Sequence, residues 1–134
     1  MTIVYAIEDR LDADEFVDVL HRSGLAERRP VDQPARIEKM LRHANLIVTA
    51  RDGTKLVGVA RSLTDFAYCC YLSDLAVDRA YQRRGIGRRL IDRTREAVGP
   101  ESMVLLLSAP QAMTYYTHIG MPRADNAFLY PRQR

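Results

Sequence analysis

Apolar residues recur along this chain with two different periods, and the period predicts which segments are strands and which are helices. A weakly alternating, β-branched segment over residues 3–7 predicts a first strand. Helical spacing then predicts two helices. The first has Asp12 as N-cap with Glu15 three residues later and stops at Gly24, and the second starts near Pro34. The chain therefore begins with a strand and two helices.

The next part of the chain reads as a run of strands. Apolar segments over residues 46–50 and 56–63 flank the tetrapeptide Arg51-Asp52-Gly53-Thr54. Its Asp-Gly pair is a strong signal for a tight hairpin. A third apolar segment, over residues 66–77, follows the hairpin and completes a predicted antiparallel meander.

The remaining chain alternates between helix and strand patterns. An apolar stripe predicts a helix over residues 85–98, and a short continuous apolar run over 102–108 predicts a buried strand. A last helix over 111–118 ends at Gly120, before a short final strand over 127–130. The predicted order is β-α-α-β-β-β-α-β-α-β. The strand-helix-strand unit over 72–107 requires parallel strands, so we expect an α/β fold with a mixed, mostly antiparallel central sheet flanked by helices.

Composition limits the classes of protein that this chain can be. Its 134 residues, 47% of them hydrophobic and 28% charged, are the size and balance of one globular domain, so we expect a single domain over residues 1–134. Unbroken apolar runs, such as residues 103–107, are far shorter than the roughly 18 residues of a membrane helix. The first residues do not resemble an export signal. We therefore expect a soluble, cytoplasmic protein.

The cysteines and arginines limit which kinds of binding site this chain can form. Cys69 and Cys70 are neighbours that form no metal-ligand spacing with the histidines, so we expect two small residues on opposite faces of a strand and no metal site. The formal charge is only +3, yet seven arginines lie between Arg79 and Arg95. A local cluster of this kind favours one anionic group bound at one place over a general polyanion surface.

The arginine cluster surrounds two glycines, Gly85 and Gly87, at the start of the helix predicted over 85–98. Such a turn lets successive backbone N–H groups point into one hollow, where the helix dipole and the arginines favour an anion such as a diphosphate. The dinucleotide-binding fingerprint is excluded because Leu90 stands where its third glycine is needed. The Walker pattern is excluded because Arg88, not lysine, follows the second glycine.

What remains is the pattern Gln/Arg-x-x-Gly-x-Gly after a strand that ends in Leu75-Ala76-Val77. At these residues the sequence resembles the GCN5-related N-acetyltransferase (GNAT) superfamily. A second patch, Tyr115-Tyr116-Thr117-His118-Ile119-Gly120-Met121, is similar to the family's aromatic-Tyr-x-x-x-Gly-aromatic stretch, with methionine in the last aromatic position. The resemblance covers nearly the whole chain and implies the acyl-CoA N-acyltransferase fold, in which the strand matching 72–77 splays from its parallel neighbour.

The resemblance also implies acetyl-CoA as co-substrate and assigns the residues that bind it. Pantetheine would pair with the exposed main chain of the splayed strand, and the following turn would cradle the pyrophosphate. Ser108 stands where many relatives carry an asparagine that holds pantetheine. The implied cofactor-binding residues are Leu75, Ala76, Val77, Gln82, Arg83, Arg84, Gly85, Ile86, Gly87 and Arg88.

Transfer of an acetyl group to an amine requires a base for the amine, a donor to the oxyanion and an acid for the leaving thiolate. Tyr116 is the candidate acid because it lies four residues before Gly120, as the family's acidic tyrosine does. Asp74 is the carboxylate nearest the acetyl end of the implied site and is the candidate base. A hydrogen-bonded or solvated strand aspartate is the alternative interpretation of Asp74.

The acceptor is a small-molecule or protein amine that the sequence does not identify. Acidic residues around the first predicted helix would attract a cationic amine, or they serve helix capping and the helix dipole. Two other functions stay open: a CoA-binding module without catalysis and a basic nucleic-acid-binding domain. Relatives often pair as homodimers, so a homodimer is also an expectation. The acidic residues are Glu8, Asp9, Asp12, Asp14, Glu15 and Asp18.

Overall fold

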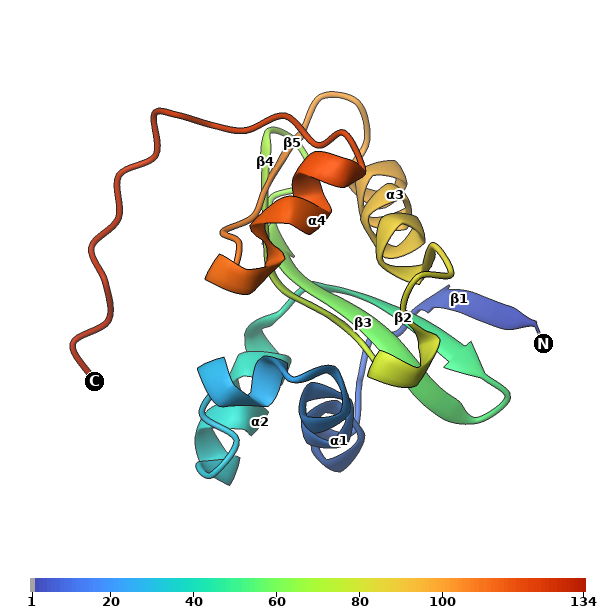
Figure 1. Ribbon diagram of the computed structural model, residues 1–134. Helices are drawn as coiled ribbons and strands as arrows, with labels where there is room; N and C mark the ends of the chain where they lie inside the picture. The colour runs from blue at the N-terminus through green and yellow to red at the C-terminus, as the bar shows by residue number, and fades with distance from the viewer. Residues whose placement is uncertain (1) are drawn as a thin grey trace.

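The computed structural model describes residues 2–134 and shows a five-stranded sheet between layers of helices (Figure 1). The strands lie in chain order, the first four antiparallel and the last parallel to the fourth. This confirms the mixed, mostly antiparallel sheet. Within residues 2–134, no helix is both long and apolar enough to cross a bilayer. The strands are β1 (Ile3–Ile7), β2 (Leu46–Asp52), β3 (Lys55–Thr64), β4 (Cys69–Val77) and β5 (Met103–Leu105).

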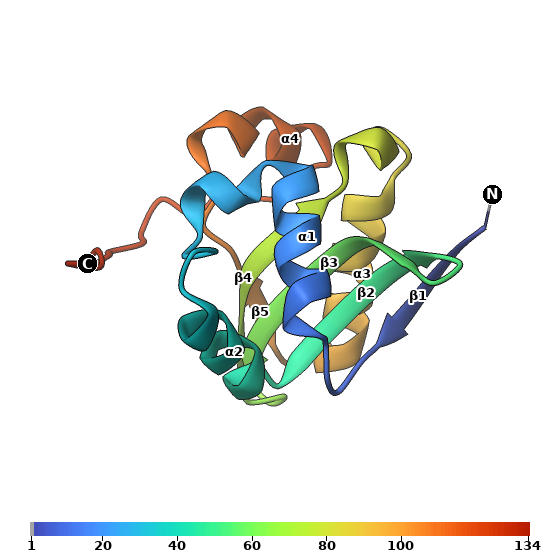
Figure 2. The same ribbon diagram turned by 90° about the horizontal axis from the view of Figure 1, so that it is seen from below.

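Helices cover both faces of the sheet. Helices α1 (Ala13–Ser23) and α2 (Pro34–His43) lie on one face, and α3 (Ile86–Val98) lies on the other (Figures 1 and 2). Helix α4 (Met113–His118) lies on the α3 side, near the ends of β4 and β5. Short 3-10 turns at Leu25–Arg28, Arg79–Tyr81 and Pro110–Ala112 connect these elements.

The boundaries of α1 follow from its capping residues, as the sequence predicted. The Asp12 carboxylate accepts the backbone N–H of Glu15 at 3.2 Å, which satisfies one free donor of the first turn. Gly24 ends the helix in the left-handed conformation, with φ at +89°. The Glu15 carboxylate does not fold back on the cap; it accepts from Arg51 of β2 at 2.7 Å and ties the helix to the sheet.

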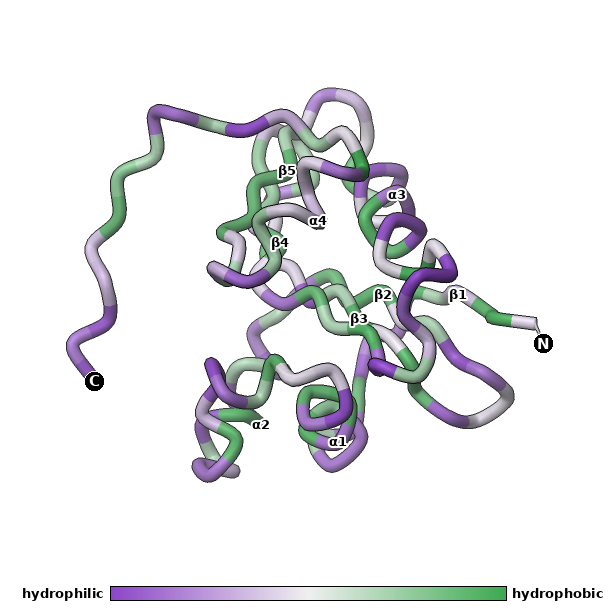
Figure 3. The backbone as a smooth tube through the Cα atoms, in the orientation of Figure 1, coloured by the Kyte–Doolittle hydropathy of each residue, from purple (hydrophilic) through white to green (hydrophobic). Residues whose placement is uncertain are grey.

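Two apolar cores, one on each face of the sheet, fix the helices. Phe16, Leu20 and Ile37 pack from α1 and α2 against one face, and Leu90 packs from α3 against the other. In Figure 3, green and purple segments alternate along the helices that pack on the sheet. A Cβ on Gly58 of β3 would come within 3.1 Å of side-chain atoms of Ile86 and Leu90, so the glycine lets α3 approach the sheet closely. This contact fixes the start of α3.

A bulge in β4 determines which residues face which core. Arg61 pairs with Asp74 and the next residue of β3 pairs with Leu72, so Ser73 is the extra residue. Leu72 therefore packs in the core under α3, whereas Asp74 faces the side of α1 and α2, where its carboxylate meets Arg61. Simple alternation would place both side chains on the same face.

Two predictions for the last third of the chain are wrong. The run over 102–108 is not a buried strand: only Met103–Leu105 is strand, it lies at the edge of the sheet, and Met103 is 59% exposed. Residues 127–130 form no strand. Hydrophobic periodicity reports the propensity of a segment and not what lies beside it, and a strand exists only where another strand supplies hydrogen bonds.

Candidate active site

A gap opens between β4 and β5. The two strands pair in parallel from Cys69 with Met103 to Tyr71 with Leu105, and no pairing continues beyond this point. Residues 72–77 of β4 therefore have no strand partner on the β5 side among the described residues. Their backbone groups on this side can pair with an extended ligand, as a further strand would. The sequence resemblance implied this splayed strand.

The turn after β4 leads directly from this gap to the start of α3. Two of its residues have left-handed backbones, Arg83 with φ at +66° and Gly85 with φ at +79°. Gly85 is the N-cap of α3, and because glycine has no side chain, it supplies no capping hydrogen bond to the first turn. The first-turn amides of a helix have no partner within the helix, so the N–H groups of this turn can bind an anion. That this turn binds a diphosphate stays a prediction.

The side chains predicted to bind the cofactor are not all accessible to a ligand. Ile86 and Ala76 are buried in the two cores, so only their backbone can contact a ligand. Gln82 is exposed and donates from Nε2 to the Val77 carbonyl at 3.1 Å, which holds the turn against the end of β4. Arg84 is exposed and lies over the Tyr81 ring at 5.2 Å. Leu75 and Val77 are half-buried on the α3 side of the sheet.

Other arginines of the cluster face away from the turn. Arg89 and Arg93 lie over the Tyr5 ring of β1, at 5.3 Å and 5.8 Å from its centroid. Arg79 lies against Gly24 at the end of α1. Only part of the cluster is therefore placed to serve one anion, and the rest packs against neighbouring elements.

Tyr116 of α4 lies on the α3 side and packs partly buried against the core that includes Leu72 and Leu75. Burial raises the pKa of its phenol to about 12, with a smaller contribution from Tyr115 in the same direction, whereas Arg29 lowers it. A phenol with this pKa is protonated at neutral pH and can donate a proton or a hydrogen bond.

The side chain of Tyr115 contacts a different part of the protein from that of Tyr116. The two rings meet edge to face, with centroids 5.2 Å apart. A Cβ on Gly87 would come within 2.4 Å of the Tyr115 hydroxyl, so this phenol lies directly over the first turn of α3. Burial raises its pKa, and nearby Arg88 lowers it. Tyr115 therefore lies beside the candidate turn, although the predicted cofactor set left it out; the spacing of the motif could not show which neighbour each ring contacts.

Asp74 lies in a buried ionic cluster. Its two carboxylate oxygens accept from the Nε atoms of Arg29 and Arg61, and the residue is completely buried. Arg29 also donates to the backbone carbonyl of Ser73 at 2.9 Å, and Arg61 donates to the Ser73 hydroxyl and to the Met40 carbonyl, both at 3.1 Å. The cluster ties the segment after α1 and the end of α2 to β4. No sequence pattern indicated Arg29 as a neighbour of the splayed strand.

Four of the six acidic residues of the N-terminal region, Glu8, Asp12, Glu15 and Asp18, have structural partners. Glu8 accepts from Arg51 at 2.9 Å, and this hydrogen bond is the main cause of its lowered pKa. Asp18 accepts from Arg22 at 3.0 Å. Together with the Asp12 cap, these contacts favour capping and cross-linking over attraction of an amine. Ser108 donates its hydroxyl to the neighbouring Ala109 carbonyl at 2.7 Å.

A family model described as "Acetyltransferase (GNAT) domain" matches residues 18–128, which include the gap, the turn and α4. The chain belongs to the GNAT acetyltransferases. Among curated proteins, it is 29% identical over 85 residues to GCN5-related N-acetyltransferase 2, chloroplastic, of Arabidopsis thaliana. That match covers 58% of this chain and spans a third of the plant protein's length (33%).

Solved structures share the fold of this GNAT domain at low sequence identity. A GNAT-family acetyltransferase of Streptococcus pneumoniae superposes with a TM-score of 0.78 at 19% identity, covering 99% of this chain and all of the other. AAC(6')-Iy in complex with the bisubstrate analogue CoA-S-monomethyl-acetylneamine superposes with a TM-score of 0.72 at 14% identity over the full length of both chains. These likenesses show the fold.

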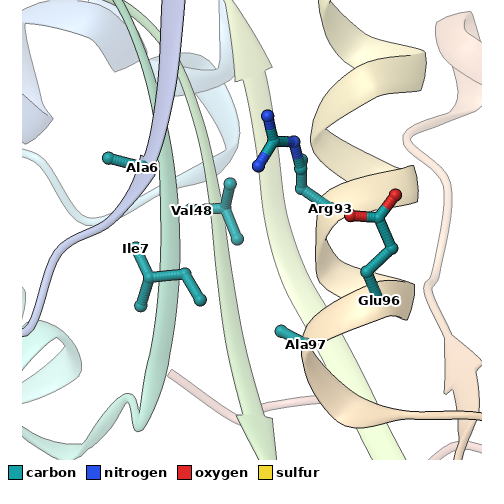
Figure 4. A pocket seen from close by; sticks show the side chains of 6 residues that line it. All are labelled: Ala6, Ile7, Val48, Arg93, Glu96 and Ala97. Atoms are coloured by element: carbon teal, nitrogen blue, oxygen red, sulfur yellow. The ribbon is translucent and has the colours of Figure 1, made fainter.

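A shallow hollow on this GNAT domain lies away from the turn. It measures about 220 Å³ and is lined by β1, β2 and the second half of α3, with Arg93 and Glu96 at its rim (Figure 4). It includes none of the residues around the splayed strand or the start of α3. The candidate site is therefore the open gap between strands and not this hollow.

Proposed function

We propose that this protein transfers an acetyl group from acetyl-CoA to a primary amine by direct attack in a ternary complex. The observation that carries the proposal is the parting of β4 from β5 beyond Tyr71 and Leu105, beside the amides at the start of α3. An extended pantetheine fits the unpaired edge of β4, and a diphosphate fits the turn over residues 82–88. The fold of AAC(6')-Iy, which was solved with a CoA-linked aminoglycoside, supports this arrangement.

In the proposed reaction the amine nitrogen attacks the thioester carbonyl carbon, and the C–S bond then breaks. A backbone N–H of the splayed strand near Leu75 would stabilise the oxyanion, and Tyr116 would donate its proton to the departing thiolate. Only about one in 2,500 amines of lysine-like pKa is neutral at pH 7, so the attacking nitrogen must also lose a proton to a base or to water. Cys69 and Cys70 lie in the paired part of β4, upstream of the gap, which favours direct attack over an acyl-cysteine intermediate.

Asp74 as the general base stays a prediction, and its geometry favours another role. Both of its oxygens already accept hydrogen bonds from guanidinium groups and the residue is completely buried, so neither oxygen is free to reach an attacking amine. We propose that Asp74 positions Arg29 against the splayed strand and beside Tyr116. The amine's proton would then leave through water.

Replacing Asp74 by alanine tests its structural role. The substitution leaves Arg29 and Arg61 without their shared carboxylate, and breaking a buried pair of this kind costs about 3–5 kcal/mol. We expect a clear fall in the free energy of unfolding, measured by urea titration. The control is Asp14→Ala, at an exposed position of α1, which should leave the free energy of unfolding nearly unchanged. An Asp74→Asn variant that stays fully stable but loses the acidic limb of its pH–rate profile would instead establish Asp74 as the base.

The proposed activity is tested by an acetyl-CoA turnover screen against polyamines, amino acids, aminoglycosides and peptide N-termini, following release of the CoA thiol. Turnover with any member establishes the reaction and identifies small-molecule or protein amines as the acceptor class. Tight CoA binding without turnover would favour the alternative, a CoA-binding module. Affinity for nucleic acid that falls steeply with salt, with no CoA binding, would favour the basic nucleic-acid-binding domain.

A cytoplasmic location, a single domain over residues 1–134 and a homodimer stay predictions from the sequence. Fractionation of cells, limited proteolysis and light scattering address them in turn. None of them is needed for the reaction proposed here.

A further inference from the structure

The ionic cluster of Arg29, Arg61 and Asp74, which we call the Asp74 cluster, has an excess of positive charge. Its salt bridges join one carboxylate to two guanidinium groups, which leaves a net charge of +1. No other carboxylate among residues 2–134 forms a salt bridge with either arginine. Burial deprives this charge of part of its hydration, so an anion that binds beside the cluster is stabilised.

Arg29 is the member of the Asp74 cluster that a ligand can reach. Its side chain is 18% exposed, compared with 7% for Arg61 and 0% for Asp74. A guanidinium group has five N–H donors. Within residues 2–134, Arg29 uses three of them, in bonds to the Asp74 carboxylate and to the backbone carbonyls of Ser73 and Arg28. The other two N–H groups can bind an anion.

Arg29 also lies close to the start of the gap between β4 and β5. Its bond to the Ser73 carbonyl holds it two residues beyond Tyr71, where the pairing with β5 ends. Arg29 follows α1 on one side of the sheet, and Tyr116 belongs to α4 on the other side (Figure 1). The charge of Arg29 nevertheless lowers the pKa of the Tyr116 phenol, so the two groups lie near each other. An amine that attacks a thioester beside Tyr116 would bring its own substituents close to Arg29.

The proposed cofactor does not supply the anion that this charge favours. Its diphosphate would lie at the turn over residues 82–88, and the pantetheine and acetyl groups in the gap are uncharged. The acceptor is the remaining source. We propose that the acceptor is an amino acid, a small amine that also carries a carboxylate, and that Arg29 binds this carboxylate. The inference rests on the proposed acetyl transfer and names its substrate class.

The same charge disfavours the other classes of acceptor. A polyamine or an aminoglycoside brings further ammonium groups, which the net positive charge of the Asp74 cluster repels. Glu8 and Asp18 do not offset this repulsion freely, because they already accept hydrogen bonds from Arg51 and Arg22. A peptide N-terminus has an amide where an amino acid has a carboxylate, so it gives Arg29 no anionic partner.

The first test compares each standard amino acid with its own carboxamide on the unaltered protein, following release of the CoA thiol. The carboxamide keeps the amine and the side chain but loses the negative charge. Values of kcat/KM are calculated per neutral amine, because a carboxylate raises the pKa of a neighbouring amine. We expect at least about a tenfold preference for the amino acid wherever turnover occurs. Equal values, or a preference for carboxamides, polyamines or peptide N-termini, would overturn the inference and leave the acetyl transfer established.

A binding measurement separates this inference from the proposed function. If no amine turns over, the proposed transfer fails, and calorimetric titration of the same pairs decides the inference alone. The amino acids and carboxamides are titrated into the protein saturated with CoA and into the protein without CoA. Binding that is at least about tenfold tighter for an amino acid than for its carboxamide supports a carboxylate site. Equal affinities, or no binding of any amino acid, would overturn it.

Replacing Arg29 by glutamine tests whether this residue is the one that determines specificity. We expect the ratio of kcat/KM between amino acid and carboxamide to fall to near one. This ratio does not depend on how much of the variant is folded, which matters because the substitution opens the Asp74 cluster. The matched control is Arg28→Gln, at the exposed neighbouring position, which should keep the ratio. If Arg29→Gln lowers both rates equally, Arg29 serves the oxyanion or the fold, and the inference is wrong.

Discussion

Replacing Tyr116 by phenylalanine is expected to lower kcat for acetyl transfer by about 10²–10⁴-fold, with little change in the KM for acetyl-CoA. The substitution removes one hydroxyl from a partly buried ring and leaves its packing against the α3-side core intact. The thiolate would then have to leave without a proton donor. Steady-state kinetics measure the effect, and Tyr68→Phe, which removes an exposed hydroxyl in the β3–β4 turn, is the matched control.

The pKa of Tyr116 gives this prediction a pH dependence. A general acid works only in its protonated form, and burial raises the pKa of this phenol to about 12. Tyr116 therefore stays competent from pH 7 to 10, and its ionisation should produce no basic limb in the kcat profile over this range. Complete proton transfer to a free thiolate of pKa about 8.5 is uphill by roughly 5 kcal/mol, so donation must accompany C–S cleavage. A basic limb near pH 8 that disappears in the phenylalanine variant would contradict this assignment.

Replacing Gly85 by alanine is expected to raise the KM for acetyl-CoA at least about tenfold. A Cβ at this position meets no atom within 4 Å, so the effect would come from the backbone alone. The left-handed conformation at φ +79° costs an L-residue about 1–2 kcal/mol, and relaxation of that strain would turn the first-turn amides of α3 away from a bound diphosphate. Isothermal titration with CoA measures the loss directly.

Gly53→Ala is the matched control for this prediction. Gly53 also has a positive φ, at +61°, and a Cβ there also meets no atom within 4 Å, but it lies in the β2–β3 hairpin. Both variants should lose similar stability, and only the Gly85 variant should lose affinity for CoA. Equal affinities in the two variants would show that the turn before α3 does not hold the diphosphate.

Much of the fold could be predicted from local patterns because those patterns are themselves physical causes. Asp12 and Gly24 set the ends of α1, and the Asp52-Gly53 pair sets the β2–β3 hairpin, each through a backbone conformation or a hydrogen bond within a few residues. The glycines at the start of α3 likewise indicated an anion-binding turn. The family resemblance, which the family match confirms, rested on this turn, on the strand before it and on the tyrosine patch of α4.

The parts that the sequence left open all depend on contacts between distant segments. Alternation alone could not show the bulge at Ser73, which turns Asp74 toward Arg29 and Arg61. The spacing of neighbouring tyrosines could not show that Tyr115 lies over Gly87 while Tyr116 packs beside the splayed strand. Hydrophobicity also could not distinguish an edge strand from a buried one. Local sequence determined where helices and turns form and where strands can form, because capping and turn hydrogen bonds act within a few residues. Only the tertiary structure decided which side chains meet, because register, bulges and strand edges are set by the partner segment.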